Sequence, residues 1–428
     1  MIIILVILTK LLPNMHINEL FFRALQIEEP WYIKSITLKD DCLVIEIDFK
    51  RGAKFEDDDN GNDIKRMYGV HDTIIKTWRH LNFLQYKCYL KARVPRIRRD
   101  DGRVRLISPS WSGVMNGFTL LFEAFILNLS KEMPVNRVSN LLGIYGNKIW
   151  NMLEIYVLGA KQYEDYSHVD TVGVDETSVA KGHDYVSLFV DLNKRKTMFI
   201  SEGKDNRTVI DFSKDLKNHH AKAEQIKEVS CDMSAAFIKG IKENLPNANI
   251  TFDKFHILKI INNGVDKVRR AEAINNPLLR NSRYALLKNV TNLTAKQKAK
   301  REELVMSKIN LKSVRAMHIR ENFQQIYVAP SVAEFECLLK KWYGWAIRSR
   351  LQPIVKAAKT IKSHWEGILR WKVSQINNGI LEGLNSILQA AKRKARGYKT
   401  THFMTMAYFL TGKLDFSKVN KFVFTHSF

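Results

Sequence analysis

Three acidic residues stand where carboxylates could do chemistry. Asp175 lies inside an apolar run, Asp232 directly follows the predicted strand 226–231, and Glu382 lies in the helix-like stretch 371–398. A carboxylate among buried apolar neighbours is costly unless it is paired or binds a metal. Two carboxylates from strand ends and one from a helix packed beside them would form a pocket of hard oxygen ligands. Such a pocket suits two Mg²⁺ ions, roughly 3.5–4 Å apart, that act on a phosphodiester.

Each of these residues also has a plainer interpretation. Taken alone, Asp175 could cap the end of a strand, and Glu382 could form an ion pair on a solvated helix face. At about 100° per residue, Glu382 shares one polar stripe with Asn385 and Gln389, and Asn378 lies one turn earlier. Bases that could contact DNA follow on the same helix, namely Lys392, Arg393, Lys394 and Arg396. The set of three carboxylates is more specific than any one of them.

The composition favours a polyanionic partner. The chain has 428 residues, of which 45% are hydrophobic, so it is long enough for two or more domains with sizeable cores. Its 68 Lys and Arg against 44 Asp and Glu leave a net charge of +24. This excess fits nucleic acid. A membrane surface is the weaker alternative, because no single basic amphipathic helix carries the excess.

The cysteines and the apolar start exclude several classes. The four cysteines are far apart, with no CxxC pair, which indicates a reducing compartment and removes the usual thiolate zinc site. Residues 1–14 are too short to span a bilayer and lack the features of a signal peptide. We therefore expect them to be a misassigned extension before Met15, and we expect a soluble protein.

The hydrophobic patterns predict an α/β RNase H-like domain interrupted by an all-α insertion. Three strands within 171–202 are followed by a helix at 208–219, a strand at 226–231, a helix at 235–244 and a strand at 249–252. In this order, the ends of the first and fourth strands come together. Residues 266 to about 365 show only helical patterns. The expected domains are 15–110, 111–168, 169–265, 266–365 and 366–428, the last with the Glu382 helix and a basic tail.

Two regions before residue 169 could bind DNA. The segment 135–156 predicts a helix-turn-helix with Gly143 in the turn, and Asn147 and Lys148 at the start of its recognition helix. Any helical hairpin would share this pattern. Residues 15–110 predict a small mixed domain whose bases either contact phosphate or form an ordinary basic face. The bases concerned are Arg79, Arg93, Arg96, Arg98 and Arg99.

Several motifs together resemble one enzyme family. VGVDETS, SCDMSAAF, FDKFH and NGILEGLNSILQAAKRKARGY are similar to the catalytic domain of DDE transposases of bacterial insertion sequences, specifically the ISL-three family. The resemblance covers most of the chain and implies Asp175, Asp232 and Glu382 as catalytic, metal-binding residues with two Mg²⁺ or Mn²⁺ ions. It supports the insertion, because 150 positions (232 to 382) separate the last two carboxylates.

The resemblance assigns further residues, each with an alternative. Asp253 and His256 match a D-x-x-H signature and would support the site, or form a strand-end turn; Asn378 and Asn385 would also support it. Trp342 and Trp345 in the insertion could stack on an unpaired base, or pack in the core. Arg269 and Arg270 are candidate DNA contacts. The family's N-terminal zinc module is degenerate here, since only Cys88 of its cysteines remains, and zinc is not expected.

The resemblance implies a transposase in the bacterial cytoplasm, associated with the nucleoid. It would bind the terminal inverted repeats of its element, cleave DNA with Mg²⁺ and join the freed end to target DNA, as a homodimer or larger assembly. A structure-specific nuclease or resolvase of the same fold is one alternative. An inactive DNA-binding derivative is another, and metal-dependent nicking would distinguish it.

Overall fold

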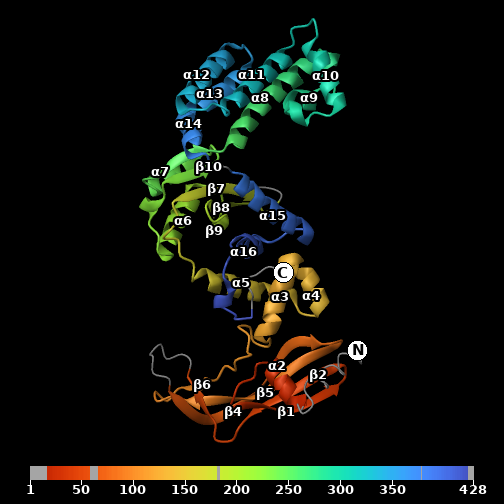
Figure 1. Ribbon diagram of the computed structural model, residues 1–428, viewed down its shortest axis with the longest axis vertical. Helices are drawn as coiled ribbons and strands as arrows, with labels where there is room; N and C mark the ends of the chain where they lie inside the picture. The colour runs from red at the N-terminus through yellow and green to blue at the C-terminus, as the bar shows by residue number, and fades with distance from the viewer. Residues whose placement is uncertain (1–16, 58–65, 181–183, 377, 423–428) are drawn as a thin grey trace. The chain divides into compact units, whose positions relative to one another are not determined.

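The chain forms two compact units in the computed structural model, which describes residues 17–57, 66–180, 184–376 and 378–422 (Figure 1). Unit 1 comprises Met1–Tyr163 together with Leu414–Phe428, and unit 2 comprises Glu164–Lys413. The expected start extension and Met15 lie outside the described residues. Within the described ranges, every helix is too short or too polar to span a bilayer.

A twisted sheet forms the first part of unit 1. Its strands run in the order β1-β2-β5-β4-β3, and β6 pairs with β5. β2 shows why these residues form strands, since its side chains alternate strictly between more and less buried positions. A short helix, α2 (Ile17–Ala24), precedes the sheet. The strands are β1 (Trp31–Lys39), β2 (Cys42–Phe49), β3 (Lys54–Glu56), β4 (Met67–Phe83), β5 (Tyr86–Arg98) and β6 (Val104–Leu106).

Three helices form the second part of unit 1: α3 (Leu120–Glu132), α4 (Val135–Leu142) and α5 (Gly146–Lys161). Gly143 ends α4 in the left-handed conformation, with φ 65°, which the tight turn into α5 requires. Ile149, Met152 and Leu153 of α5 are fully buried.

The C-terminal segment packs on these helices, which corrects the expectation that it is a basic tail of the catalytic domain. Buried Asn420 donates hydrogen bonds of 2.8 Å to the Leu120 carbonyl and to the Tyr156 hydroxyl. That hydroxyl donates in turn to the buried Glu123 carboxylate, at 2.6 Å. Burial raises the pKa of Glu123, while the Tyr156 hydrogen bond opposes that rise.

Unit 2 is built on a five-stranded mixed sheet in the order β11-β10-β7-β8-β9. β7, β8 and β9 are antiparallel, whereas β10 runs parallel to both β7 and β11. The expected meeting of the first and fourth strands is therefore confirmed. The strands are β7 (Thr171–Ser178), β8 (Tyr185–Asp191), β9 (Lys196–Glu202), β10 (Glu228–Cys231) and β11 (Asn249–Phe252).

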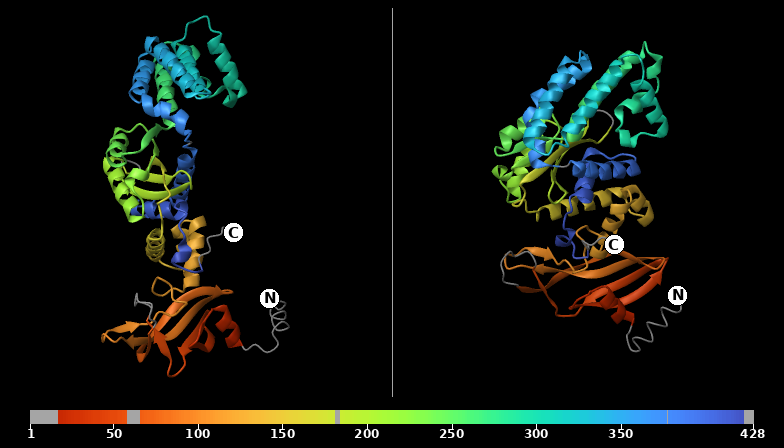
Figure 2. Two further views of the ribbon diagram at one scale, coloured as in Figure 1. Left: turned by 60° about the vertical axis from the view of Figure 1, so that its left-hand side comes forward. Right: turned by 45° about the horizontal axis from the view of Figure 1, so that its top comes forward.

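Helices cover both faces of this sheet (Figure 2). On one face, α6 (Asn206–Asn218) and α7 (Ala235–Asn244) share the main core with alternate strand residues such as Val174 and Phe189. On the other face, α15 (Gly379–Ala395) and α16 (Thr400–Thr411) pack through Leu388 and Phe403 against the opposite strand residues. Asp205 caps α6 by accepting a hydrogen bond from the Arg207 N–H.

A bundle of helices separates β11 from α15. It begins with α8, which crosses the boundary expected at residue 266 because it starts directly after β11. Glu272 near the end of α8 accepts hydrogen bonds from the Lys312 and Ser313 N–H groups, which fixes α11 beside it. The helices are α8 (Lys254–Ala273), α9 (Arg283–Leu287), α10 (Ala295–Val305), α11 (Lys312–Ile326), α12 (Val332–Arg348), α13 (Gln352–Ser363) and α14 (Trp365–Ser374).

Candidate active site

Three aspartates occupy one row at the edge of the unit 2 sheet. Ser230 of β10 pairs with Gly173 of β7, and Cys231 pairs with Phe252 of β11. Continuing this register brings Asp232 level with both Asp175 and Asp253, since the three strands run in parallel. Asp175 is the one that lies within a strand, while the other two follow their strands directly.

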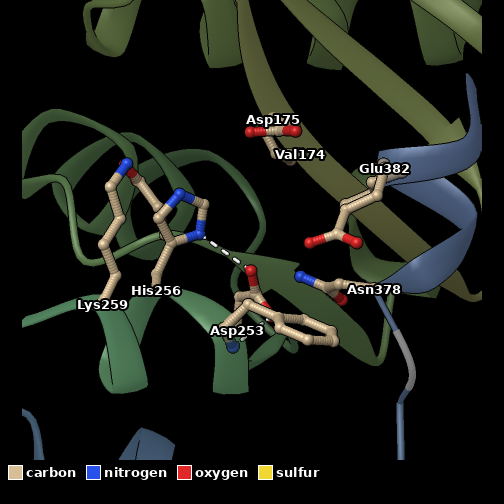
Figure 3. A pocket seen from close by; sticks show the side chains of 10 residues that line it. Val174, Asp175, Asp253, His256, Lys259, Asn378 and Glu382 are labelled. Atoms are coloured by element: carbon tan, nitrogen blue, oxygen red, sulfur yellow. Dashed lines mark hydrogen bonds and ion pairs between the residues drawn. The ribbon is translucent and has the colours of Figure 1, made fainter. Parts of the chain in front are cut away.

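Glu382 reaches the same space from the first turn of α15. Asp175, Asp232, Asp253 and Glu382 all line a cavity of about 170 Å³. In Figure 3, the side chains of Asp175, Asp253 and Glu382 surround a common opening. The sequence separation of 207 positions (175 to 382) is thus bridged by the fold. Glu382 lines this cavity, and among the described residues no ion pair is found for its carboxylate.

Close packing of α15 on β7 sets the position of Glu382. A Cβ atom on Gly173 would lie 3.0 Å from both Leu381 methyl carbons and 2.8 Å from a Leu192 methyl carbon. The missing side chain therefore lets the helix approach the strand. Asn378, at the start of the helix, accepts a 2.7 Å hydrogen bond from the Ser230 hydroxyl, which ties α15 to β10.

Asn385 and Gln389, in the polar stripe of α15, face β7. The Asn385 side-chain amide donates a 2.5 Å hydrogen bond to Oδ2 of Asp175. One turn later, Gln389 donates to the Thr177 hydroxyl at 2.9 Å, and Lys392 donates to the Ser178 carbonyl at 2.8 Å. The helix therefore orients the Asp175 carboxylate directly.

The electrostatics of the cavity favour a cation. Burial, with smaller contributions from the Asp232 and Asp253 carboxylates, raises the pKa of Asp175 to about 6. The His256 ring lies 2.8 Å from Asp253, and this hydrogen bond raises the pKa of the imidazole. Lys259, one turn further along α8, also lines the cavity. Sequence reasoning missed Lys259, although its i+3 spacing from His256 was visible.

The donor set fits a divalent hard cation by chemistry. It consists of the carboxylate oxygens of Asp175, Asp232, Asp253 and Glu382, which all line the cavity. As the side chains lie, no group of three or more His, Cys, Asp or Glu in the described ranges is close enough to hold a metal. Binding would therefore require side-chain rotation, for which exposed Glu382 has the freedom.

Several expected DNA contacts are engaged in ion pairs within their own unit. Arg93 pairs with Asp48, Arg96 with Asp72, and Arg99 with the buried Asp57. In unit 2, Arg269 and Arg270 both pair with one carboxylate, Asp266. Arg98 lies 3.3 Å from the His71 ring. The remaining expected contacts named here lie at exposed positions. They are the amide side chain of Asn147 and the bases Lys148, Arg393, Lys394 and Arg396.

The two tryptophans of the helical bundle differ in exposure. Trp342 is buried, donates its indole N–H to the Ile319 carbonyl at 2.8 Å and packs edge-on against Phe323. It therefore belongs to the core and cannot stack on a base, which corrects that part of the prediction. Trp345 is 42% exposed.

Comparison with known proteins defines the class to which this site belongs. Residues 172–408, more than half of the chain, match the profile of a family described as Transposase, the ISL3 group of DDE transposases. The chain therefore belongs to the ISL3 family of DDE transposases, and the resemblance seen in the sequence is confirmed.

Curated relatives carry the same description. The chain is 26% identical over 345 residues to the transposase for insertion sequence element IS1001 of Bordetella parapertussis, a match covering 78% of this chain and 84% of the relative. It is 23% identical over 366 residues to the transposase for IS1557 of Mycobacterium tuberculosis, with 79% and 81% covered.

Proposed function

We propose that this chain binds the terminal inverted repeats of an insertion sequence and catalyses Mg²⁺-dependent DNA cleavage and strand transfer. The observation that carries the proposal is that Asp175, Asp232 and Glu382 line one cavity although they come from strand β7, the end of strand β10 and a distant helix. The charge of +24 supports a DNA substrate. The strand order of unit 2 supports an RNase H-like fold, and α4, Gly143 and α5 support a helix-turn-helix.

Asp175, Asp232 and Glu382 would hold the divalent ions. When bound, these ions would supply activation of water and neutralisation of charge on the phosphodiester. The Asn385 amide donates to one oxygen of Asp175 and so fixes the orientation of the Asp175 carboxylate. Asp253 holds His256 beside the cavity, where the ring and Lys259 offer positive charge to a DNA phosphate.

The remaining expected residues support DNA binding to different degrees. Exposed Arg393, Lys394 and Arg396 extend from the last turns of α15, on the helix that carries Glu382, and would contact the DNA strand being cut. The arginines already paired with aspartates, in unit 1 and in unit 2, are less available to DNA than these exposed bases. Because two element ends must be held together, we include assembly as a dimer or larger form. Zinc forms no part of the proposal.

Charge removal in the carboxylate set tests the mechanism. Asp175→Asn, Asp232→Asn and Glu382→Gln should each lower Mg²⁺-dependent nicking of a repeat-bearing duplex by about a thousandfold or more, with DNA binding unchanged. Glu176→Gln is the matched control, because it neutralises the next residue of β7, which does not line the cavity.

The outcomes separate the candidate functions. A Glu382→Gln protein that nicks repeat DNA at the wild-type rate would contradict the proposed role of Glu382 as a metal ligand. Wild-type cutting that depends on branched structure rather than on the repeat would favour the nuclease or resolvase. Repeat binding without any metal-dependent nicking would favour an inactive DNA-binding derivative.

A further inference from the structure

A second cavity, of about 280 Å³, lies within unit 1, where β4 and β5 meet the turn between α4 and α5. Three cations line it: Arg79 from β4, Lys87 from β5 and Lys148 from α5. The described residues that line this cavity include no carboxylate. Its remaining walls are mostly aromatic and aliphatic. The cavity thus has a positive charge that no acidic side chain in its lining offsets.

Arg79 is the most informative of these cations because it is buried. It is only 8% exposed, and its Nη1 group has no hydrogen-bond partner among the described residues. Its Nη2 donates to Asn82 at 2.5 Å, and the guanidinium lies over the rings of Tyr89 and Phe122. A buried charge with an unsatisfied donor is costly, so this donor indicates an anionic ligand.

The first turn of α5 adds a second attraction for anions. This 16-residue helix begins after Tyr145 and has no side-chain cap. The Lys148 N–H donates to the Tyr145 carbonyl, which leaves the Gly146 and Asn147 N–H groups of the first turn available. Backbone hydrogen bonds hold the opposite wall: the Arg79 N–H donates to Gly117, and the Thr119 N–H donates to the Arg79 carbonyl. The cavity is therefore built by fixed backbone on the sheet side.

We propose that this cavity binds a single backbone phosphate of DNA, held jointly by the sheet and by the turn before α5. This inference rests on the proposed function and refines it. DNA fits better than a free anion because Lys87, Lys148 and Tyr145 are exposed at the cavity, and Tyr145 is 81% exposed where it can contact an adjoining sugar. A phosphate contact fixes the orientation of the protein on DNA without reading sequence.

Lysine variants of the full-length protein test the proposal without disturbing the core. The probes are a duplex carrying the inverted repeat that flanks the gene and an unrelated duplex of equal length. Lys87→Gln and Lys148→Gln should each weaken binding of both duplexes roughly tenfold and reduce the salt dependence of log K by about one. Lys39→Gln, an exposed lysine at the end of β1 outside the cavity, should change neither.

A neutral methylphosphonate scanned along the repeat identifies the phosphate. One position should weaken wild-type binding and have no further effect in Lys148→Gln. Arg79→Met should weaken DNA binding while its unfolding temperature stays near that of the wild type, because it removes a buried charge that lacks a full set of partners. If this variant unfolds early, the lysine variants decide the question.

Failure of the inference is distinct from failure of the proposed function. Wild-type protein that binds neither duplex at low salt would overturn the function and the inference together. Wild-type binding with unchanged affinity in Lys87→Gln and Lys148→Gln would overturn the phosphate site alone. The same holds if inorganic phosphate binds and is lost in these variants while DNA binding is retained.

Discussion

At the scale of single residues, Asn385 differs from the three carboxylates because it contacts one of them from outside the cavity. It donates to Asp175 but does not line the cavity in which the carboxylates meet. Groups that orient a metal ligand typically change metal affinity or activity by roughly 10–100-fold when they are removed. We therefore propose that Asn385 is a positioning residue and that Asp175 would touch the ions.

We expect Asn385→Ala to raise the Mg²⁺ concentration needed for half-maximal nicking by roughly 10–100-fold, with a smaller loss of rate at saturating metal. Titration of nicking with Mg²⁺ measures both quantities. Gln389→Ala is the control, because Gln389 bonds to Thr177 and Ser178 on the same strand and not to Asp175. Equal Mg²⁺ requirements in the two variants would contradict the assignment.

At the scale of elements, much of the architecture was predictable from local pattern. The strand at 249–252 and the helix at 235–244 occur with the expected bounds, because their apolar periodicity is clear. The approach of α15 to β7 was not predictable, since it depends on Gly173 lacking a side chain opposite Leu381. The ion pairs of Arg96 and Arg99 were also hidden, because their aspartates lie 24 and 42 residues away.

The close packing of α15 on β7 can be tested by adding a side chain at Gly173. We expect Gly173→Val to push Leu381 away, to displace Glu382 and to lower nicking by about a hundredfold, since misplacement by about 1 Å has effects of that size. DNA binding should stay near wild type. Gly69→Val is the control: it makes the same change in strand β4, where an added Cβ meets nothing within 4 Å. Nicking at the wild-type rate in Gly173→Val would exclude the proposed role of this contact.

At the scale of the whole molecule, the chain leaves unit 1 after Tyr163 and returns to it at Leu414. The packing of the C-terminal segment on unit 1 could not be predicted from the sequence, because the segment after residue 412 shows only scattered bases and no periodic element. The link depends on one buried amide, Asn420, which is 1% exposed and bonds to two groups of the helical part. Unit 1 is therefore incomplete without residues from beyond unit 2.

Asn420→Ala should destabilise unit 1 by about 2–3 kcal/mol, because it leaves the Leu120 carbonyl without its side-chain donor and the buried Tyr156 hydroxyl with one partner fewer. Urea unfolding followed by tryptophan fluorescence measures the change. Asn136→Ala, at an exposed position of α4, should shift stability by less than about 0.5 kcal/mol. Similar midpoints for the two variants would show that the returning segment contributes little.

Because the chain returns to unit 1 after unit 2, a protease must cut at two places to separate the two units. Because unit 2 is inserted within unit 1, a single nick at the junction after Tyr163 leaves unit 2 joined to the C-terminal segment of unit 1, while residues 1–163 form a separate fragment. The two fragments would part in a denaturing gel yet migrate together under native conditions, held by the packing of residues 414–422 on the helices of unit 1. Only a second cut near Leu414 would free unit 2, so limited proteolysis of the native protein should release it in two steps.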